Sequence, residues 1–358
     1  MAQVARESGF EVVVATRLGA GASQFTDKGF RVVPVDGRRG SLSLLQGKRE
    51  FVQAFRIVRA ERPDIVHCIS LRPIVIGGVA AKLAGARQII LAPTGLGHLW
   101  IEQKPSAVII RKLVRSVIRW LRGPRTHFLF ENGDDPGELG LDPNSSEVSI
   151  VGGAGVDPNQ FALAPQPPEP PVKIAVVARM IAPKGIAEAV AAVQQVRAAG
   201  MSVELHLFGA PDPANRQSIP EQKLLQWSRQ PGIAWHGHTA DVAGIWRQHH
   251  IAMLLSSYRE GLPRALVEAA ATGRPIVTTN VPGCREVVRD GQEGILVSPG
   301  DVEAAARALM RLSEDRGLRE RMGAAAYARF RERFTVDAVK QTVRKLYQSL
   351  GVMSDARG

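Results

Sequence analysis

Short apolar runs alternate with helix-length amphipathic segments along the first half of the chain. The runs have the length of buried strands, and they lie at 11–16, 31–35, 64–70, 88–91 and 126–132. Segments with the spacing or composition of helices separate several of them, at 51–58, 73–85 and 104–125. This alternation predicts βαβ units and a parallel sheet.

The same alternation restarts beyond residue 172. Strands are predicted at 173–179, 202–209, 232–237, 251–255, 275–279 and 294–298. Helices are predicted at 184–199, 222–228, 262–272, 301–312 and 316–332. A last helix over 335–350 has Thr335 as its N-cap and a long apolar face, and we expect it to cross back to the first half of the chain.

A proline-rich stretch separates the two halves. Residues 162–172, ALAPQPPEPPV, contain five prolines, which is typical of a semi-rigid extended linker. The sequence therefore predicts an α/β protein of two Rossmann-like domains, 1–161 and 173–334, followed by a crossover helix over 335–350. Two such domains on a short linker imply a cleft between them.

The first nine residues have the pattern of a helix that leads into the strand at 11–16. The strand expected before such a helix is absent, and in a doubly wound sheet that first strand is central. We therefore expect two neighbouring strands of the first domain to lack a partner in the middle of the sheet.

Composition narrows the class of protein. Apolar content of 45% and charged content of 22% are ordinary for a globular chain, and no apolar run reaches the length of a membrane span. The beginning lacks the pattern of a secretion signal. Two distant cysteines predict neither a disulfide framework nor a metal site, so a reducing cytoplasm fits best.

The net charge of +12 indicates either many solvated arginines or an anionic partner. No nucleic-acid-binding module is recognisable. The charge gathers in the helix over 104–125, which carries seven cations and no acid among apolar residues: Lys104, Arg111, Lys112, Arg115, Arg119, Arg122 and Arg125. This composition is typical of helices on anionic membrane surfaces. The alternative is a surface helix that packs its apolar stripe on the sheet.

The stretch 256–284 carries the chemistry. A buried strand ends in small polar residues, Glu260 follows, and Pro263 opens a helix that contains Glu268 and ends at Gly273. Helix N-termini attract anions, and two carboxylates beside such a site can bind hydroxyl groups. A phosphate flanked by polyol hydroxyls describes a nucleotide-sugar.

Arg179 and Lys184 flank a short turn after the strand at 173–179. At the carboxyl end of a parallel strand they would point toward the ligand crevice, where a guanidinium and an ammonium suit a diphosphate. Two solvated loop charges are the alternative.

The motifs AVVARMIAPKG, LFG, WHGHTADV, SSYREGLPRALVEAAATGRPIVTT, GCREVV and DGQEGILVSPGD follow one another. In this order they resemble the retaining glycosyltransferases of family 4, which have the GT-B fold. The resemblance covers roughly 10–350 and is strongest over 173–300. In the first half, VHCISLRPIVIGG, TGLGHLW, FENGDD and GAGVD resemble a branch that acts on lipid-linked sugars in bacterial surface polysaccharide assembly.

This resemblance implies that Glu260, Arg179 and Lys184 are catalytic. Glu260 would contact hydroxyls of the donor sugar, and the two cations would bind the diphosphate and stabilise the departing nucleoside diphosphate. Glu268 would hold the ribose. The other donor-binding residues would be Gly209, Gly261, Leu262 and Pro263.

The resemblance also implies a reaction without cofactor or metal, since Asp134 and Asp135 are adjacent and form no Asp-x-Asp motif. The donor would be a UDP-linked hexose or N-acetylhexosamine, transferred with retention by a front-face path rather than by a glycosidase-like carboxylate pair. The acceptor would be a lipid-linked sugar or saccharide, with the protein peripheral on the inner face of the plasma membrane. Acceptor-side residues would be Arg72, Thr94, Gly95, Gly97 and His98.

Three alternatives compete with transfer. A dinucleotide-dependent dehydrogenase is excluded, because neither Gly19-Ala20-Gly21 nor Gly153-Ala154-Gly155 is completed to G-x-G-x-x-G. A GT-B sugar-nucleotide epimerase fits the 256–284 motif less well. A non-catalytic relic that binds a nucleotide-sugar is the alternative of a different class, because the first strand is missing.

Overall fold

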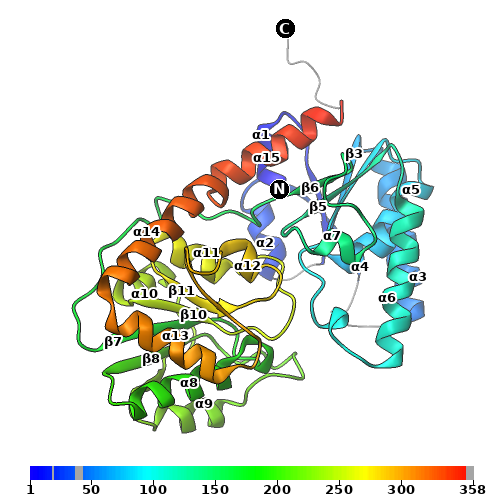
Figure 1. Ribbon diagram of the computed structural model, residues 1–358. Coiled ribbons are helices and arrows are strands. Elements are labelled where there is room, and N and C mark those ends of the chain that lie inside the picture. Colours follow the sequence, from blue (N-terminus) through cyan, green and yellow to red (C-terminus); the bar gives the residue numbers. More distant parts are fainter. Residues whose placement is uncertain (18–19, 37–42, 352–358) are drawn as a thin grey trace. The chain divides into compact units, whose positions relative to one another are not determined.

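The structure is a computed structural model that describes residues 1–17, 20–36 and 43–351 (Figure 1). It divides into two compact units. The first unit comprises Met1–Val151 and the chain from Val339 on, and the second comprises Gly152–Ala338. The last helix, α15 (Val336–Ser349), therefore continues from the second unit into the first.

Two parallel sheets form in the first unit. The strands β1 (Val13–Thr16) and β2 (Arg31–Pro34) pair with each other. The other sheet has the order β3-β4-β5-β6, with bounds Ile65–Ile69, Gln88–Ala92, Thr126–Phe130 and Val148–Ile150. Within the described ranges no strand joins the two sheets. The short strand β6 was not predicted, because polar residues precede it and hide its three-residue pattern.

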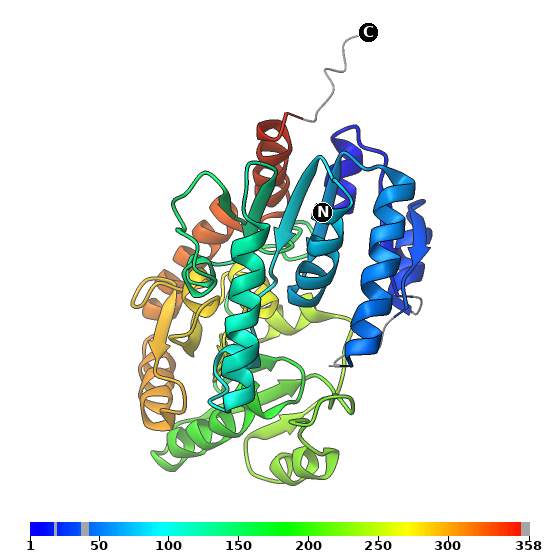
Figure 2. The ribbon, with the colours of Figure 1, turned by 90° about the vertical axis from the view of Figure 1, so that its right-hand side faces the viewer.

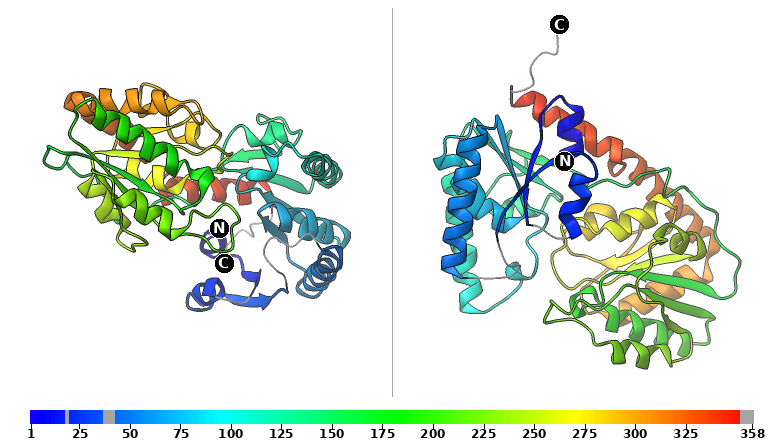
Figure 3. Two further views of the ribbon diagram at one scale, coloured as in Figure 1. Left: turned by 90° about the horizontal axis from the view of Figure 1, so that it is seen from below. Right: turned by 180° about the vertical axis from the view of Figure 1, so that it is seen from behind.

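Helices cover both faces of the four-stranded sheet. On one face, a core cluster joins the strands to α3 (Leu44–Glu61), α5 (Val79–Leu83) and α6 (Pro105–Leu121). Figure 2 shows α3 and α6 nearest the viewer. On the other face, α1 (Ala2–Glu7) and α15 contribute Val4, Val339, Val343 and Leu346. Figure 3 (right) shows α1 beside α15. Shorter elements are α2 (Ala20–Thr26), α4 (Leu71–Pro73), a π-helical turn (Ile74–Gly78), η2 (His98–Trp100) and α7 (Asp135–Glu138).

The second unit contains a six-stranded, fully parallel sheet with the order β12-β11-β10-β7-β8-β9. Its strands, from β7 to β12, are Val172–Val177, Val203–Phe208, Ile233–Trp235, Ile251–Leu254, Ile276–Thr279 and Gly294–Val297. A parallel sheet covered on both faces needs nearly continuous apolar strands. The burial of every residue of β10 and β11 agrees with this rule.

Helices α8 (Ile186–Ala198), α9 (Glu221–Ser228) and α13 (Val302–Glu314) cover one face of this sheet. Helices α10 (Val242–Gln248), α11 (Arg264–Ala271) and α12 (Cys284–Val287) cover the other (Figure 1), and α14 (Arg316–Arg333) packs against α11. The N-cap predicted at Thr335 is confirmed, because its Oγ1 accepts a hydrogen bond from the N–H of Ala338 at 3.1 Å.

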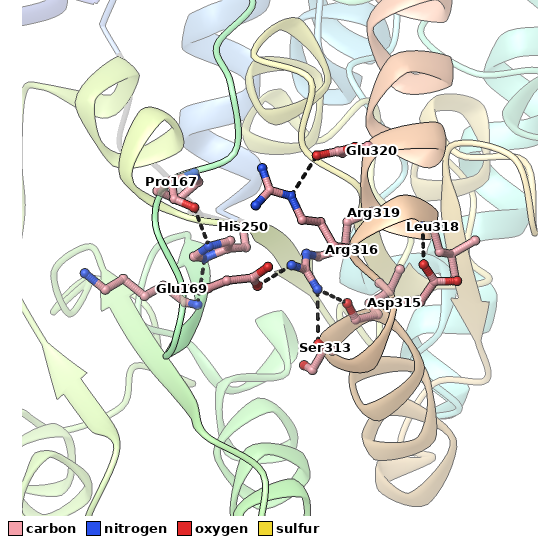
Figure 4. A network of polar contacts seen from close by, with 11 residues as sticks. Pro167, Glu169, His250, Ser313, Asp315, Arg316, Leu318, Arg319 and Glu320 are labelled. Carbon is pink, nitrogen blue, oxygen red and sulfur yellow. Dashed lines mark hydrogen bonds and ion pairs between the residues drawn. The ribbon is translucent and has the colours of Figure 1, made fainter.

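The proline-rich segment packs along the second unit, whereas the sequence predicted a linker at 162–172 between domains. Arg274 donates to the carbonyls of Ala164 and Pro165, at 2.6 and 2.8 Å. Further along, Glu169 pairs with the buried Arg319 (Figure 4). The prediction overlooked these partners because they lie more than a hundred residues away in sequence.

His250 completes this attachment. Its Nδ1 accepts a hydrogen bond from the N–H of Lys173 at 2.9 Å, and its Nε2 lies 3.1 Å from the carbonyl oxygen of Pro167 (Figure 4). An imidazole that accepts at Nδ1 must carry its proton on Nε2 in order to donate to a carbonyl. Burial lowers the pKa of His250 to about 4, so this neutral form persists at neutral pH.

Candidate active site

Lys184 and Glu260 lie at the carboxyl ends of two neighbouring central strands. Lys184 belongs to the 3-10 turn η3 (Ala182–Lys184) that follows β7, and Glu260 lies in the loop between β10 and α11. Because β7 and β10 are parallel and paired, the loops after them meet at one edge of the sheet. Lys184 Nζ is 2.6 Å from Glu260 Oε1, and the two side chains are 13% and 9% exposed.

The surroundings keep Lys184 charged. Burial by itself would lower its pKa, but the Glu260 carboxylate and Tyr258 outweigh burial and raise the pKa of Lys184 above its usual value. Lys184 Nζ lies 5.3 Å from the centroid of the Tyr258 ring. Ser256 Oγ donates to the same oxygen of Glu260 at 2.6 Å. The result is a desolvated cation and carboxylate on two adjacent loops.

Two close backbone approaches hold these loops. The N–H of Ser257 donates to the carbonyl of Pro183 at 2.9 Å, which ties the loop after β10 to the loop after β7. Gly283, at the start of α12, has φ +79° and lies so close to the carbonyls of Glu260 and Gly261 that a Cβ there would clash. Gly209, predicted to bind the donor, has φ +140°, and a Cβ on it would overlap the carbonyl of Ala178. The absence of a Cβ at Gly209 therefore permits this close backbone approach at the end of β8.

Glu268 lies on α11, which begins at Arg264 and has Pro263 as its N-cap residue. The side chain is 8% exposed, and Arg264 Nε donates to its Oε1 at 2.7 Å. Burial raises the pKa of Glu268, with hydrogen bonding to Arg264 opposing this rise. The buried indole of Trp246, on α10, also opposes the rise in the pKa of Glu268. Leu262 packs against Gly153.

Arg179 has a different partner from the one expected. The sequence suggested that Arg179 and Lys184 act as one cationic pair, but Arg179 Nη1 donates to Asp212 Oδ2 at 2.7 Å. Its side chain is 51% exposed, far more than that of Lys184. Arg179 and Lys184 therefore both follow β7, but the two cations are held by separate acids.

The residues predicted to lie on the acceptor side belong to the first unit. Arg72 follows β3 and Thr94 follows β4, and these parallel strands end together, with the N–H of Ser70 donating to the carbonyl of Ala92 at 2.8 Å. Arg72 contacts Glu50 through Nε and Nη2, at 2.8 and 3.1 Å. Gly95 and Gly97 both have positive φ, +93° and +62°. The side chain of His98 lies outside the described part of the structure.

Sequence reasoning missed several polar partners at these two edges. Ser256 and Tyr258 adjoin Glu260 in sequence, so they could have been found. Asp212 carried no signal, because it lies 33 residues from Arg179. Ser70 has φ +74° and ψ 159°, a strained combination that glycine usually supplies and that is common at functional sites.

The basic helix predicted over 104–125 corresponds to α6. The sequence suggested that its cations lack acidic partners, but three of them pair with acids outside the helix: Lys104 with Glu102, Arg115 with Glu138 and Arg122 with Glu147. Lys112 and Arg119 are exposed and make no ion pair with the described residues. Ile109, Leu113 and Trp120 on the same helix are 66%, 60% and 47% exposed.

The described residues offer neither a metal-binding cluster nor a membrane-spanning helix. No group of three or more His, Cys, Asp and Glu side chains is arranged to hold a metal ion. No helix among these residues is sufficiently long and apolar to cross a bilayer.

The chain therefore consists of two α/β units, and its last helix has residues in both of them. The model of the group 1 glycosyl transferases matches residues 171–315, and the glycosyl transferase 4-like model matches residues 1–121. By these two matches the chain is a glycosyltransferase of the group 1 and 4-like type. The resemblance inferred from the sequence is thereby confirmed.

Curated relatives agree with this assignment. A capsular polysaccharide biosynthesis glycosyltransferase of Staphylococcus aureus, CapM, is 27% identical over 49% of this chain and 46% of its own length. The Escherichia coli UDP-Gal:alpha-D-GlcNAc-diphosphoundecaprenol alpha-1,3-galactosyltransferase is 24% identical over 86% of this chain and 81% of its own length. Thus the S. aureus match spans less than half of that relative.

Among solved structures, Anabaena HepE in complex with UDP and glucose superimposes with a TM-score of 0.77. It is 16% identical, and the match covers 97% of this chain and 95% of HepE. At this identity the likeness shows the fold, and the predicted GT-B fold is confirmed.

Proposed function

We propose that this glycosyltransferase moves a hexose or N-acetylhexosamine from a UDP-sugar, with retention, onto a lipid-linked or saccharide acceptor in cell-surface polysaccharide assembly. The observation that carries the proposal is the buried Lys184–Glu260 pair at the carboxyl ends of β7 and β10. Ligands of open α/β sheets bind at this edge. Glu268 lies on α11, the helix that directly follows the loop with Glu260.

Each group has a distinct role in this proposal. The charged Lys184 stabilises the negative charge that develops on the departing diphosphate. The Glu260 carboxylate, held by Ser256 and Lys184, accepts hydrogen bonds from hydroxyls of the donor sugar. Glu268 binds the ribose hydroxyls. No cofactor or metal is needed for these steps, and the family resemblance supports retention.

The names of the relatives support the choice of substrates. The E. coli relative is named for transfer from UDP-Gal to a diphosphoundecaprenol-linked sugar, and HepE was solved with UDP and glucose. In this chain, Arg72, Thr94, Gly95, Gly97 and His98 are the proposed acceptor residues. A protein that binds a nucleotide-sugar without transferring it, or an epimerase, would share the donor edge.

Transfer is tested by incubating the purified chain with UDP-hexoses and an undecaprenyl-diphosphate-linked sugar, and by measuring UDP release and the labelled lipid product. We expect Glu260→Gln to reduce transfer by about a hundredfold, because one well-placed electrostatic contact contributes roughly this much to catalysis. The matched control is Glu303→Gln, since Glu303 is 78% exposed. Binding of a UDP-hexose without release of UDP, whichever acceptor is added, would instead indicate a non-catalytic binding protein.

We further propose that the protein is cytoplasmic and docks on the inner face of the plasma membrane through α6. Ile109, Leu113 and Trp120 form an exposed apolar stripe, because they lie four and seven residues apart on the helix. Lys112 and Arg119 flank this stripe without acidic partners among the described residues. An apolar face bordered by cations matches an anionic bilayer surface.

Charge reversal at Lys112 and Arg119 is expected to reduce binding to vesicles that contain anionic phospholipid. Each cation near such a surface contributes about 1 kcal/mol, so the double variant Lys112→Glu, Arg119→Glu should bind at least about tenfold more weakly. Vesicle flotation measures this change. Arg115→Gln with Arg122→Gln is the matched control, since these cations already pair with Glu138 and Glu147. Equal flotation of wild type and Lys112/Arg119 variant would make α6 an ordinary surface helix.

A further inference from the structure

The Arg179–Asp212 pair lies at the same edge of the sheet as Lys184 and Glu260, one strand further along. Arg179 follows β7 and Asp212 follows β8, and these strands are paired in parallel up to Val177 and Phe208. Arg179 Nη1 donates to Asp212 Oδ2 at 2.7 Å. Its Nε and Nη2 groups make no hydrogen bond within the described chain, so most of the guanidinium donors remain available.

Asp212 is itself held firmly by the loop that carries it. Its N–H donates to Ser218 Oγ at 2.9 Å, and its carbonyl accepts from the N–H of Asn215 at 2.8 Å. This loop is hydrogen-bonded to the turn after β7, where the N–H of Ala182 donates to the carbonyl of Gln217 at 2.9 Å. On the other side, the N–H of Ile219 donates to the carbonyl of Met180 at 2.9 Å.

We propose that Asp212 is a positioning residue for the donor diphosphate, acting through Arg179. The proposal rests on the function proposed above. A solvent-exposed arginine samples many rotamers, and fixing it before the ligand arrives reduces the entropy lost on binding. Asp212 holds the Arg179 guanidinium through one nitrogen, and the remaining N–H groups then face the phosphate oxygens. The planar guanidinium is suited to bind phosphate through two such groups at once.

The competing effect is repulsion between Asp212 and the diphosphate. Asp212 is 23% exposed, so water screens its charge in part. Two substitutions separate the effects. Asp212→Asn removes the charge and keeps an oxygen that accepts from Arg179, whereas Asp212→Ala removes both. A positioning role therefore predicts that only alanine weakens diphosphate binding.

The experiment measures the affinities of UDP and of uridine for the wild type, Asp212→Asn, Asp212→Ala, Arg179→Ala and the double variant Arg179→Ala, Asp212→Ala by calorimetry. We expect Asp212→Ala to bind UDP about fivefold more weakly, because part of the free energy of a charge-assisted hydrogen bond is lost. Asp212→Asn should remain within twofold of wild type. Uridine affinity should be equal in all five proteins, and Asp212→Ala should have no further effect once Arg179 is removed.

Each other outcome overturns the proposal. Unchanged or tighter UDP binding by Asp212→Ala, an additive loss in the double variant, or an equal loss for uridine would make Asp212 a purely structural or repulsive residue. Wild-type protein that does not bind UDP would refute the proposed function together with this role. Normal binding of UDP that is insensitive to Asp212 would refute only the role of Asp212.

Discussion

Replacing Lys184 by methionine is expected to lower the rate of sugar transfer by about a thousandfold and to destabilise the second unit by about 3 kcal/mol. The catalytic loss follows from the proposed function, because Lys184 would be the most desolvated cation facing the leaving diphosphate. The loss of stability follows from the structure alone, since Glu260 would keep a carboxylate only 9% exposed without its cation. Steady-state kinetics and urea unfolding measure the two effects separately.

A double variant distinguishes the two contributions. In Lys184→Met, Glu260→Gln the lost cation and the lost carboxylate compensate each other, because a neutral pair of similar volume avoids the unpaired buried charge. Ser256 Oγ still has an oxygen to which it can donate. We therefore expect this variant to recover most of the stability and none of the activity. Full transfer activity in the Lys184→Met variant would exclude Lys184 from the proposed mechanism.

Replacing Glu169 by alanine is expected to destabilise the second unit by about 2 kcal/mol. Arg319, with a side chain only 1% exposed, would then retain its charge without an acidic partner. The carbonyls of Leu312 and Ser313 accept from its Nη1, at 2.6 and 3.1 Å, and compensate only in part. This expected loss of stability is smaller than the usual cost of breaking a buried ion pair, because Glu169 itself is 24% exposed and water can reach it.

The same helix offers a matched control. Arg316 and Glu320 form an i,i+4 pair whose side chains are 59% and 53% exposed (Figure 4). Glu320→Ala should therefore change the free energy of unfolding by less than about 0.5 kcal/mol. Chemical denaturation of both variants provides the comparison. Equal effects at the two positions would show that the proline-rich segment is not held by the Glu169–Arg319 pair.

The sequence alone determined the strands and helices that carry the donor edge. The alternation of apolar runs and helical stripes is a local property, so β7, β10 and α11 were predicted within a few residues. The spacing of Glu260 and Glu268 is also local, since both lie between the end of one strand and the end of the next helix. The motifs around them were sufficient to predict the family and the GT-B fold.

Only the tertiary structure decided which charges meet. It paired Lys184 with Glu260, Arg179 with Asp212 and Arg319 with Glu169, partners separated by 76, 33 and 150 residues. It also neutralised three cations of the basic helix and attached the proline-rich segment to the second unit. Hydrophobic periodicity specifies which face of an element is buried, but it carries no information about which distant polar group will lie opposite. That choice depends on the order of strands in the sheet, and for this reason the acids that hold the two proposed diphosphate-binding cations became visible only in the folded chain.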